Sequence, residues 1–351
     1  MDRTHYIGLD GHARSCDLAV VSAGGRSVRR WHLPTSIPQL VEAIESVAKP
    51  RKLTLEEGPM ADWFMRRLAP YVDELVVCDP RRNALIGKDQ DKTDAIDART
   101  LAELYRGGYL RAVHHAASED RELFKRHLAL YHDRVRQRVR EGNKTLGFFR
   151  RFGIVELGEA LDDPDRRSDM LRQLAEGGQR ALACDDAKML LESYDLLKKH
   201  ERRVRRSLER RAGRVDILIR WAAVPGVKWI RASTLYVYLD TPDRFRNKSA
   251  LWKYLGIGLV KKTSGQGPVV LRPTDRCNRT LKGAILGAAK SAARKEGSPF
   301  QRQYRRLIEE GHDARIATRV VARSLATVLW GMWKHGGEYD PGRVGRPDGK
   351  G

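Results

Sequence analysis

The sequence contains little cysteine, and it has no long hydrophobic run. Its four cysteines, Cys16, Cys78, Cys184 and Cys277, show neither CxxC nor Cys/His spacing, so neither a zinc site nor a disulfide framework is indicated. No apolar stretch approaches the roughly 20 residues of a transmembrane helix, and the first residues enter a strand pattern instead of a signal-peptide pattern. We therefore expect a cytoplasmic protein with reduced cysteines and no membrane partner.

Acidic residues are few relative to basic ones. The 351 residues include 67 Lys and Arg against 45 Asp and Glu, which gives a net charge of +22. Such an excess predicts a polyanionic partner, most simply nucleic acid. A basic protein of the membrane surface is the competing interpretation, but it would need an amphipathic helix with large apolar residues opposite its basic face. The length predicts two or three domains.

Two of the acidic residues are spaced so that a helix brings them together. In the stretch Lys92–Arg99, Asp94 and Asp97 lie three positions apart and precede an amphipathic run, so both carboxylates share one helix face. They repel each other unless a cation lies between them, and Mg²⁺ (or Mn²⁺) prefers such oxygen ligands. The alternative interpretation is that Thr93 caps the helix and that both acids only favour its first turn.

Two further carboxylates each follow a predicted strand. Asp10 ends the first apolar run of the chain, and Glu56 ends a later one. Carboxylates at strand ends, beside a helix that carries Asp94 and Asp97, can converge on one metal cluster, as two-metal phosphoryl transfer requires. Glu57 is an alternative to Glu56, which we favour because it directly follows the apolar alternation of its strand.

Other acids in this region have simpler explanations. Asp79 precedes Pro80, and Asp-Pro pairs favour turns. Asp89 and Asp91 lie in the polar loop before the predicted helix, where acidic side chains are usually solvated. We therefore leave these three out of the predicted metal site.

Residues 1–112 are predicted to form an α/β domain. Strands are expected around residues 5–10, 17–21, 28–33, 52–56 and 74–78. Helices are expected over residues 37–48 and 60–68. A turn at Gly24-Gly25 joins the second and third strands as a hairpin.

Residues 113–220 are predicted to form a basic, coiled-coil-like region. One helix covers residues 116–150, and a second runs from about 186 to 220 with an imperfect apolar spacing that Glu201 and Arg211 interrupt. The excess of one charge predicts a nucleic-acid face, with a solvated face as the alternative. Its candidate residues are Arg134, Arg138, Arg202, Arg203 and Arg206. Two long helices can also pair between protomers, so we expect a homo-oligomer, either a dimer or a tetramer.

Residues 221–337 are predicted to form a helical domain. The turn Val224–Val227 resembles half of a helix-hairpin-helix, which presents backbone N–H groups to phosphates, although most such turns are only turns. The basic, glycine-containing loop Lys261–Gly267 carries Ser264, which by itself would cap a turn or contact a phosphate. The nucleic-acid candidates of this domain are Lys261, Lys262 and Arg279. Residues 338–351 are predicted to be a disordered basic tail.

Together these residues resemble a known family. The sequence has a four-acid set that looks like the DEDD set of a RuvC-like nuclease domain with the RNase H fold: Asp10, Glu56, Asp94 and Asp97. Three antiparallel strands followed by helix, strand and helix is also the RNase H-like order. The amino-acid sequence of residues 54–58 and 92–99 resembles that of the IS110-family transposases of insertion sequences, and the resemblance continues through residues 254–265.

The resemblance implies an enzyme that cuts and rejoins DNA. In this family a serine follows a segment like residues 254–258 and is similar to the nucleophile of serine recombinases, and Ser264 is the matching position. Relatives are similar to recombinases that a noncoding bridge RNA guides to target and donor DNA. The resemblance therefore implies DNA and RNA as partners, and association with the bacterial nucleoid. The chain departs from the common family pattern in residues 275–279.

Two other functions stay open at this point. One is a metal-dependent nuclease of the Holliday-junction type, which forms no covalent intermediate and uses Ser264 only to contact a phosphate. The other is a nucleic-acid-binding protein without catalysis, against which the four acids and Ser264 argue.

Overall fold

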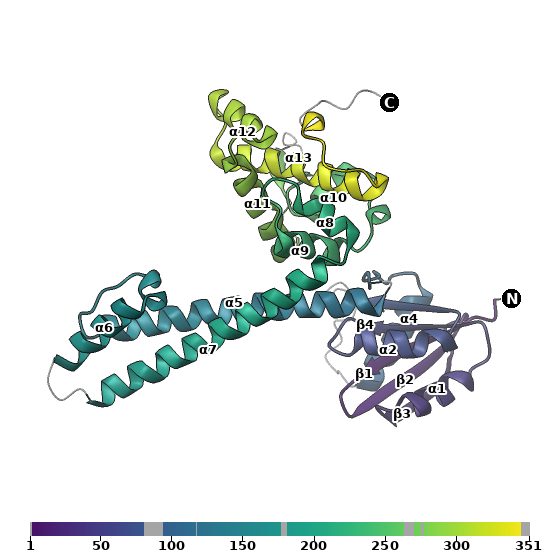
Figure 1. The fold of residues 1–351 in the computed structure, drawn as a ribbon. Helices are drawn as coiled ribbons and strands as arrows, with labels where there is room; N and C mark the ends of the chain where they lie inside the picture. Colours follow the sequence, from purple (N-terminus) through teal and green to yellow (C-terminus); the bar gives the residue numbers. More distant parts are fainter. Residues whose placement is uncertain are drawn as a thin grey trace. The chain divides into compact units, whose positions relative to one another are not determined.

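The chain forms two compact units. The structure, a computed structural model, describes residues 2–80, 94–116, 118–176, 181–262, 270–274 and 277–344. The first unit spans Met1–His115 and the second spans Ala116–Gly351. The first contains a sheet with helices on it and the second is largely helical, so the predicted mixed α/β class is confirmed (Figure 1). None of the described helices is both long enough and apolar enough to cross a membrane.

A five-stranded sheet with the order β3-β2-β1-β4-β5 organises the first unit. Its strands are β1 (His5–Gly11), β2 (Ser15–Ser22), β3 (Ser27–Pro34), β4 (Arg51–Glu56) and β5 (Glu74–Cys78). β1, β2 and β3 are antiparallel neighbours, whereas β4 runs parallel to both β1 and β5. The helices are α1 (Ile37–Glu45), α2 (Ala61–Leu68) and α4 (Asp94–Arg106), with a 3-10 turn η1 (Ala69–Tyr71). The order of the first six elements agrees with the prediction.

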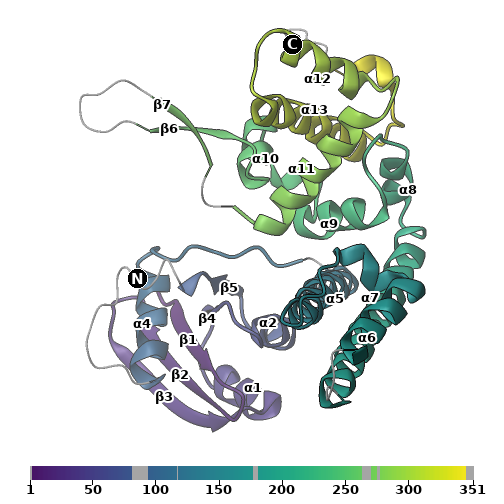
Figure 2. The same ribbon diagram turned by 90° about the vertical axis from the view of Figure 1, so that its left-hand side faces the viewer.

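The two faces of this sheet are covered by different helices. Ile7 and Leu9 of β1 and Leu53 of β4 are fully buried in one core with Leu40 of α1 and Phe64 of α2. α4 packs on β1, β2 and β4 from the opposite face, as Figure 2 shows. The apolar alternation along β1 and β4 therefore decides which face is the core, and the remaining residues of both strands face α4.

An antiparallel pair of long helices begins the second unit. This arm, residues 119–212, consists of α5 (Glu119–Arg150), the 3-10 turn η2 (Gly158–Asp162), α6 (Pro164–Glu176) and α7 (Ala181–Ala212). α5 and α7 pack side by side along much of their length (Figure 1). Near the end of α5, buried Phe149 packs with Met170 of α6 and Leu191 of α7 in a small separate core.

The arm contains one helix beyond the two that were predicted, α6, which begins at Pro164. The carboxylate of Asp163 accepts two backbone N–H groups of its first turn at 3.0 and 3.3 Å. Asp and Pro at such positions begin helices as well as turns. The second long helix ends at Ala212 instead of continuing to residue 220, because Gly213 is a poor helix former and a separate helix follows.

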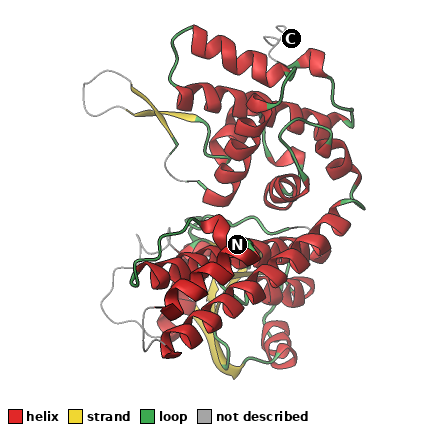
Figure 3. Cartoon of the chain, turned by 60° about the vertical axis from the view of Figure 1, so that its left-hand side comes forward, coloured by secondary structure: helices red, strands yellow, loops and turns green. Residues whose placement is uncertain are grey.

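The rest of the second unit is a helical domain with a hairpin. Its helices are α8 (Asp216–Ala222), α9 (Trp229–Leu239), η3 (Pro242–Arg244), α10 (Lys248–Tyr254), α11 (Arg279–Arg294), α12 (Pro299–Glu309), α13 (Ala314–His335) and η4 (Pro341–Arg343). The strands β6 (Leu259–Lys262) and β7 (Val270–Pro273) pair as an antiparallel hairpin that extends away from the helices (Figure 3).

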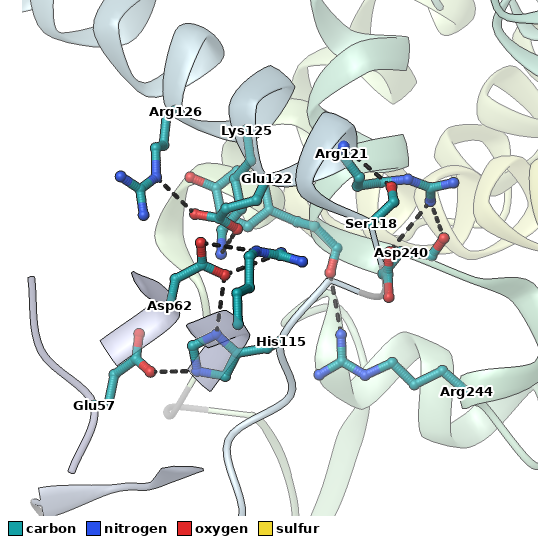
Figure 4. Close-up of polar contacts among 12 residues, drawn as sticks. Glu57, Asp62, His115, Ser118, Arg121, Glu122, Lys125, Arg126, Asp240 and Arg244 are labelled. Carbon is teal, nitrogen blue, oxygen red and sulfur yellow. Dashed lines mark hydrogen bonds and ion pairs between the residues drawn. The ribbon is translucent and has the colours of Figure 1, made fainter. Parts of the chain in front are cut away.

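One arginine joins the arm to this helical domain. The guanidinium carbon of Arg121 lies 3.9 Å from the centre of the Tyr236 ring, and its Nη2 donates to the Tyr236 hydroxyl at 2.8 Å. Arg121 also pairs with Asp240, as Figure 4 shows. A cation that both stacks on a ring and pairs with a carboxylate fixes the start of α5 on α9.

The first residues of the predicted tail pack against the helical domain. Tyr339 and Val344 pack against the core of the helical domain, and η4 lies between them. Residues 345–351 lie outside the described residues. The predicted divisions at residues 112 and 220 are tested by nothing in the structure and stay predictions.

The turn at Pro225-Gly226 supplies a testable packing contact. Gly226 has a φ of +80°, and a Cβ at this position would lie 2.2 Å from the carbonyl oxygen of Ala288 in α11. We expect Gly226→Ala to destabilise the second unit by about 2–4 kcal/mol, because it combines an overpacked contact with a left-handed backbone. Urea unfolding measures this loss.

A second glycine of the same domain serves as the matched control. A Cβ on Gly283 of α11 would meet no atom within 4 Å, so Gly283→Ala should stabilise the protein by about 0.5–1 kcal/mol through helix propensity. Equal effects of the two substitutions would contradict the packing argument.

Candidate functional site

Two of the four predicted carboxylates each come directly after one member of a residue pair on two neighbouring strands. β1 and β4 are parallel, and Leu9 pairs with Leu55, so the next residues along the two strands are Asp10 and Glu56. Paired residues of neighbouring strands point to the same face of a sheet. Asp10 and Glu56 therefore lie side by side at one end of the sheet, on the face that α4 covers.

α4 crosses this face directly beside Asp10. Gly8 of β1 approaches α4 so closely that a Cβ would lie 1.9 Å from the carbonyl oxygen of Ala98. Only glycine permits this contact, because any side chain would push the helix off the strand. Gly8 and Asp10 are two residues apart and share a face, so α4 packs against the part of β1 that leads to Asp10.

The direction of α4 brings its first residues to the same end of the sheet. The ring of Tyr105, near the end of α4, meets the ring of Tyr6 with centroids 5.6 Å apart. Arg106 donates to the carbonyl of Ala23 at 3.5 Å. Ala23 directly follows β2, whose last residues pair with the first residues of β1. α4 therefore runs antiparallel to β1, and its first residue, Asp94, lies toward Asp10.

The side chains of the predicted quartet are described to different extents. The Asp10 side chain is 22% exposed, and its Oδ2 lies 3.3 Å from His12 Nε2. Glu56 is exposed and Asp97 is half-buried, while the Asp94 side chain lies outside the described residues. Among the described side chains, no group of three or more His, Cys, Asp or Glu is arranged to hold a metal ion. The joint metal site stays a prediction that depends on Asp94.

Two more polar residues lie in the same row across the sheet as Asp10, on the neighbouring strands. The sequence pattern did not reveal them. Asp17 of β2 is the register partner of Asp10, and His32 of β3 is the partner of Asp17. Asp17 is only 7% exposed, and its Oδ2 lies 3.0 Å from His32 Nδ1. A carboxylate inside an apolar strand was the available signal, but only the pairing of strands brings it beside Asp10.

Glu56 and Glu57 have different surroundings. Glu57 Oε2 lies 2.7 Å from His115 Nε2, and His115 Nδ1 lies 3.9 Å from Asp62, as Figure 4 shows. The backbone N–H of Glu57 also donates to the carbonyl of Cys78. Glu57 is thus held beside His115, whereas Glu56 belongs to β4 and faces α4. The sequence analysis did not single out His115.

The polar groups at the other end of this face are paired with one another. Lys52 Nζ lies 2.6 Å from Glu74 Oε2, and this contact raises the pKa of Lys52 and lowers that of Glu74. Burial, followed by the charge of Glu74, raises the pKa of the Tyr105 hydroxyl. The contact between α4 and the sheet at this end is the ring packing of Tyr105 on Tyr6, at the opposite end of β1 from Asp10.

The predicted serine belongs to the segment between the two hairpin strands. Thr263 and Ser264 lie outside the described residues, as do the side chains of Lys261 and Lys262, whose backbone forms the end of β6. Trp252 donates its indole N–H to Thr327 at 3.3 Å, and Arg323 Nε donates to the carbonyl of Ile257 at 2.8 Å. These contacts hold the base of the hairpin on α13.

One comparison with known proteins identifies a family that part of the chain resembles. Residues 220–305 match a family model described as "Transposase IS116/IS110/IS902 family". This part of the chain is similar to IS110-family transposases. The similarity supports a transposase function in general, with DNA as a partner. No curated protein matches the sequence.

The matched region contains the hairpin strands and the predicted serine. It runs from the middle of α8 into α12. The acids of the first unit lie outside it, so their role rests on their own geometry and on the sequence resemblance.

Two of the predicted nucleic-acid-binding residues already have partners within the arm. Arg138 Nε donates to Glu201 Oε2 at 2.5 Å across the pair of long helices. Although burial opposes it, the hydrogen bond to Glu201 raises the pKa of Arg138. Arg134 donates to Gln137 at 2.8 Å. Glu201 interrupts the apolar stripe of α7 because it pairs with Arg138 on α5.

Three other candidates form an open basic surface on α7. Arg202, Arg203 and Arg206 of α7 are exposed and make no ion pair with any residue that the structure describes. Arg202 and Arg206 line a cleft of about 580 Å³ together with Lys198 and Lys199. Exposed cations of this kind suit phosphate contacts. Arg279, the first residue of α11, is also exposed. Binding by any of these residues stays a prediction.

Proposed function

We propose that this transposase cuts and rejoins DNA with a metal-bound acidic quartet and a serine nucleophile, under the guidance of a noncoding bridge RNA. The quartet is Asp10, Glu56, Asp94 and Asp97, in a first unit of the RuvC-like, RNase H type. The nucleophile is Ser264. The observation that carries the proposal is the convergence of Asp10, Glu56 and the start of α4 on one end of one sheet face.

The chemistry of these residues suits Mg²⁺ or Mn²⁺. All four ligands are carboxylates, the oxygen donors that such cations prefer. Asp10 and Glu56 come from rigid strands whose register fixes their spacing, and Asp94 and Asp97 come from a helix that Gly8 holds close to the sheet. When bound, the ions supply charge stabilisation for the phosphate that is attacked.

The serine supplies the step that conserves the bond for rejoining. The Ser264 hydroxyl loses its proton and its oxygen bonds to a DNA phosphorus, while one phosphodiester P–O bond breaks and the released strand hydroxyl takes up a proton. Rejoining is the reverse, in which a strand hydroxyl attacks the phosphoserine and releases Ser264. Because each step exchanges one P–O bond for another, no external energy source is needed.

Two surface features support the proposed partners. The exposed arginines 202, 203 and 206 suit a phosphate backbone of RNA or DNA, whose contacts carry no sequence information. Leu182, Met189 and Leu196 repeat every seven residues on α7 and are 77%, 62% and 53% exposed. An exposed heptad stripe favours pairing with a second copy of the arm, in agreement with the expected dimer or tetramer.

The test is denaturing electrophoresis of labelled DNA after incubation with the wild-type protein, its RNA and Mg²⁺. We expect a labelled species that migrates with the protein and yields a Ser264 peptide after digestion. Cut DNA without any protein-linked species would instead support the metal-dependent nuclease of the Holliday-junction type. Binding with no cutting at any metal concentration would support the non-catalytic protein.

A further inference from the structure

A basic cleft lies between α11, α12 and α13 of the helical domain, and none of its lining residues belongs to the predicted catalytic set. Its volume is about 440 Å³. Lys290 and Arg294 of α11 line one side, Arg315 and Arg319 of α13 line another, and Tyr304 of α12 completes the wall. No acidic side chain lines the cleft, so its charge has one sign.

These four cations are placed where they repel one another. Lys290 and Arg294 are four residues apart on one helix, and Arg315 and Arg319 are four apart on another. Like charges at this spacing destabilise a helix by about 0.2–0.5 kcal/mol per pair. Here α11 packs against α13, so the two pairs also face a common space. Such an arrangement costs stability unless an anion occupies the cleft.

Within the described residues, three of the four cations have no counter-ion. Lys290, Arg294 and Arg319 form no ion pair and no side-chain hydrogen bond there. Arg315 Nε lies 3.4 Å from the Asp313 carboxylate, which also caps α13 by accepting the Arg315 backbone N–H at 2.8 Å. One carboxylate therefore balances one cation, and the other three are available to a ligand.

We propose that this cleft binds the sugar–phosphate backbone of a nucleic-acid strand. Lys290, Arg294 and Arg319 would contact phosphate oxygens, for which ammonium and guanidinium groups are the usual partners. The apolar part of the lining, Leu286 and the Tyr304 ring, suits the sugar or base beside the phosphate. The cleft has the size of a small-molecule site, so a backbone segment enters it and a whole double helix does not.

The position of the cleft relates it to the hairpin. Arg315, Arg319 and Arg323 follow one another at four-residue intervals along one face of α13, with an axial rise of about 6 Å per step. Burial, followed by the charge of Arg319, lowers the pKa of Arg323, which donates to the carbonyl of Ile257 just before β6. A strand held in the cleft thus lies on the helix face that supports the base of the hairpin. This inference rests on the proposed function and adds a strand-binding site to it.

The salt dependence of binding tests the proposal. The full chain is titrated onto fluorescent single-stranded DNA and single-stranded RNA of about 20 nucleotides, between 50 and 200 mM salt. Each phosphate contact contributes about 0.7 to the logarithmic salt slope of a single strand. Removal of two cations by Lys290→Gln with Arg319→Gln should lower the slope by about 1.4, so the wild type loses about sevenfold more affinity over this range than the variant. The strand that shows the change identifies its source as RNA or DNA.

A matched variant of the same domain controls for general charge. Arg305→Gln with Arg306→Gln removes the same charge from α12, where neither residue lines the cleft. We expect its salt slope to change by less than half as much. Equal changes in both double variants would overturn the proposal, as would an unchanged slope in the cleft variant. If the wild type binds neither DNA nor RNA, the proposed function itself is wrong. If the wild type binds but the cleft variant keeps the wild-type slope, only the proposed cleft site is wrong.

Thermal unfolding shows whether the cleft cations are structural. Removing like-charge repulsion should leave the melting temperature of Lys290→Gln with Arg319→Gln unchanged or higher. A lower melting temperature together with weaker binding would indicate that these cations stabilise the fold, and would overturn a dedicated binding site.

Discussion

Replacement of Asp10 or Asp94 by asparagine is expected to lower DNA cleavage by at least about 10³-fold while nucleic-acid binding persists. Loss of a metal-ligating carboxylate removes several kcal/mol of transition-state stabilisation, and about 4 kcal/mol corresponds to three decades in rate. Each substitution keeps the size of the side chain, so the packing of α4 on Gly8 is undisturbed. Cleavage is measured with labelled DNA and binding with the same DNA in Ca²⁺.

Thermal unfolding adds a readout that does not depend on activity. A cation that binds only the folded state stabilises it by mass action, so Mg²⁺ should raise the melting temperature of the wild type and not that of Asp10→Asn. The matched control is Glu57→Gln, because Glu57 lies beside His115 instead of facing α4. We expect Glu57→Gln to keep most of the activity. If it fails like Asp10→Asn while Glu56→Gln cleaves normally, Glu57 is the ligand.

Ser264→Ala is expected to abolish cleavage and rejoining together, with complex assembly retained. The proposed reaction has no other route to a protein-linked DNA end, because the serine oxygen itself forms the new P–O bond. The measurement is denaturing electrophoresis of labelled DNA, with assembly followed by native electrophoresis. Activity should fall to the detection limit, and the protein-linked species should disappear.

The neighbouring hydroxyl provides the control for this experiment. Thr263 shares the same segment of the hairpin, so Thr263→Ala tests whether any hydroxyl loss in this segment stops the reaction. We expect much more activity in Thr263→Ala than in Ser264→Ala. If Ser264→Ala still cuts DNA, the serine is a phosphate contact, and a nuclease that uses water as the nucleophile replaces the proposed mechanism.

Much of the first unit could be predicted because its determinants are local. Alternating apolar residues such as Leu53 and Leu55 specify a strand with one buried face, and the acid that follows them then lies at the strand end. Local reasoning does not decide the structure at Asp163 and Pro164, because these residue types favour both a turn and a helix start. Packing of Met170 into the small core of the arm decides for the helix.

The amino-acid sequence alone determined the net charge, the acidic strand ends, the Asp94 and Asp97 spacing and the similarity of residues 220–305 to a transposase family. Only the tertiary structure decided which residues become neighbours. Asp17 and His32 lie beside Asp10 because three strands pair in one register. Glu201 accepts a hydrogen bond from Arg138 because two helices distant in sequence pack together. The basic cleft likewise needs three helices. Such contacts depend on chain segments far apart in sequence, and no local spacing or periodicity encodes them.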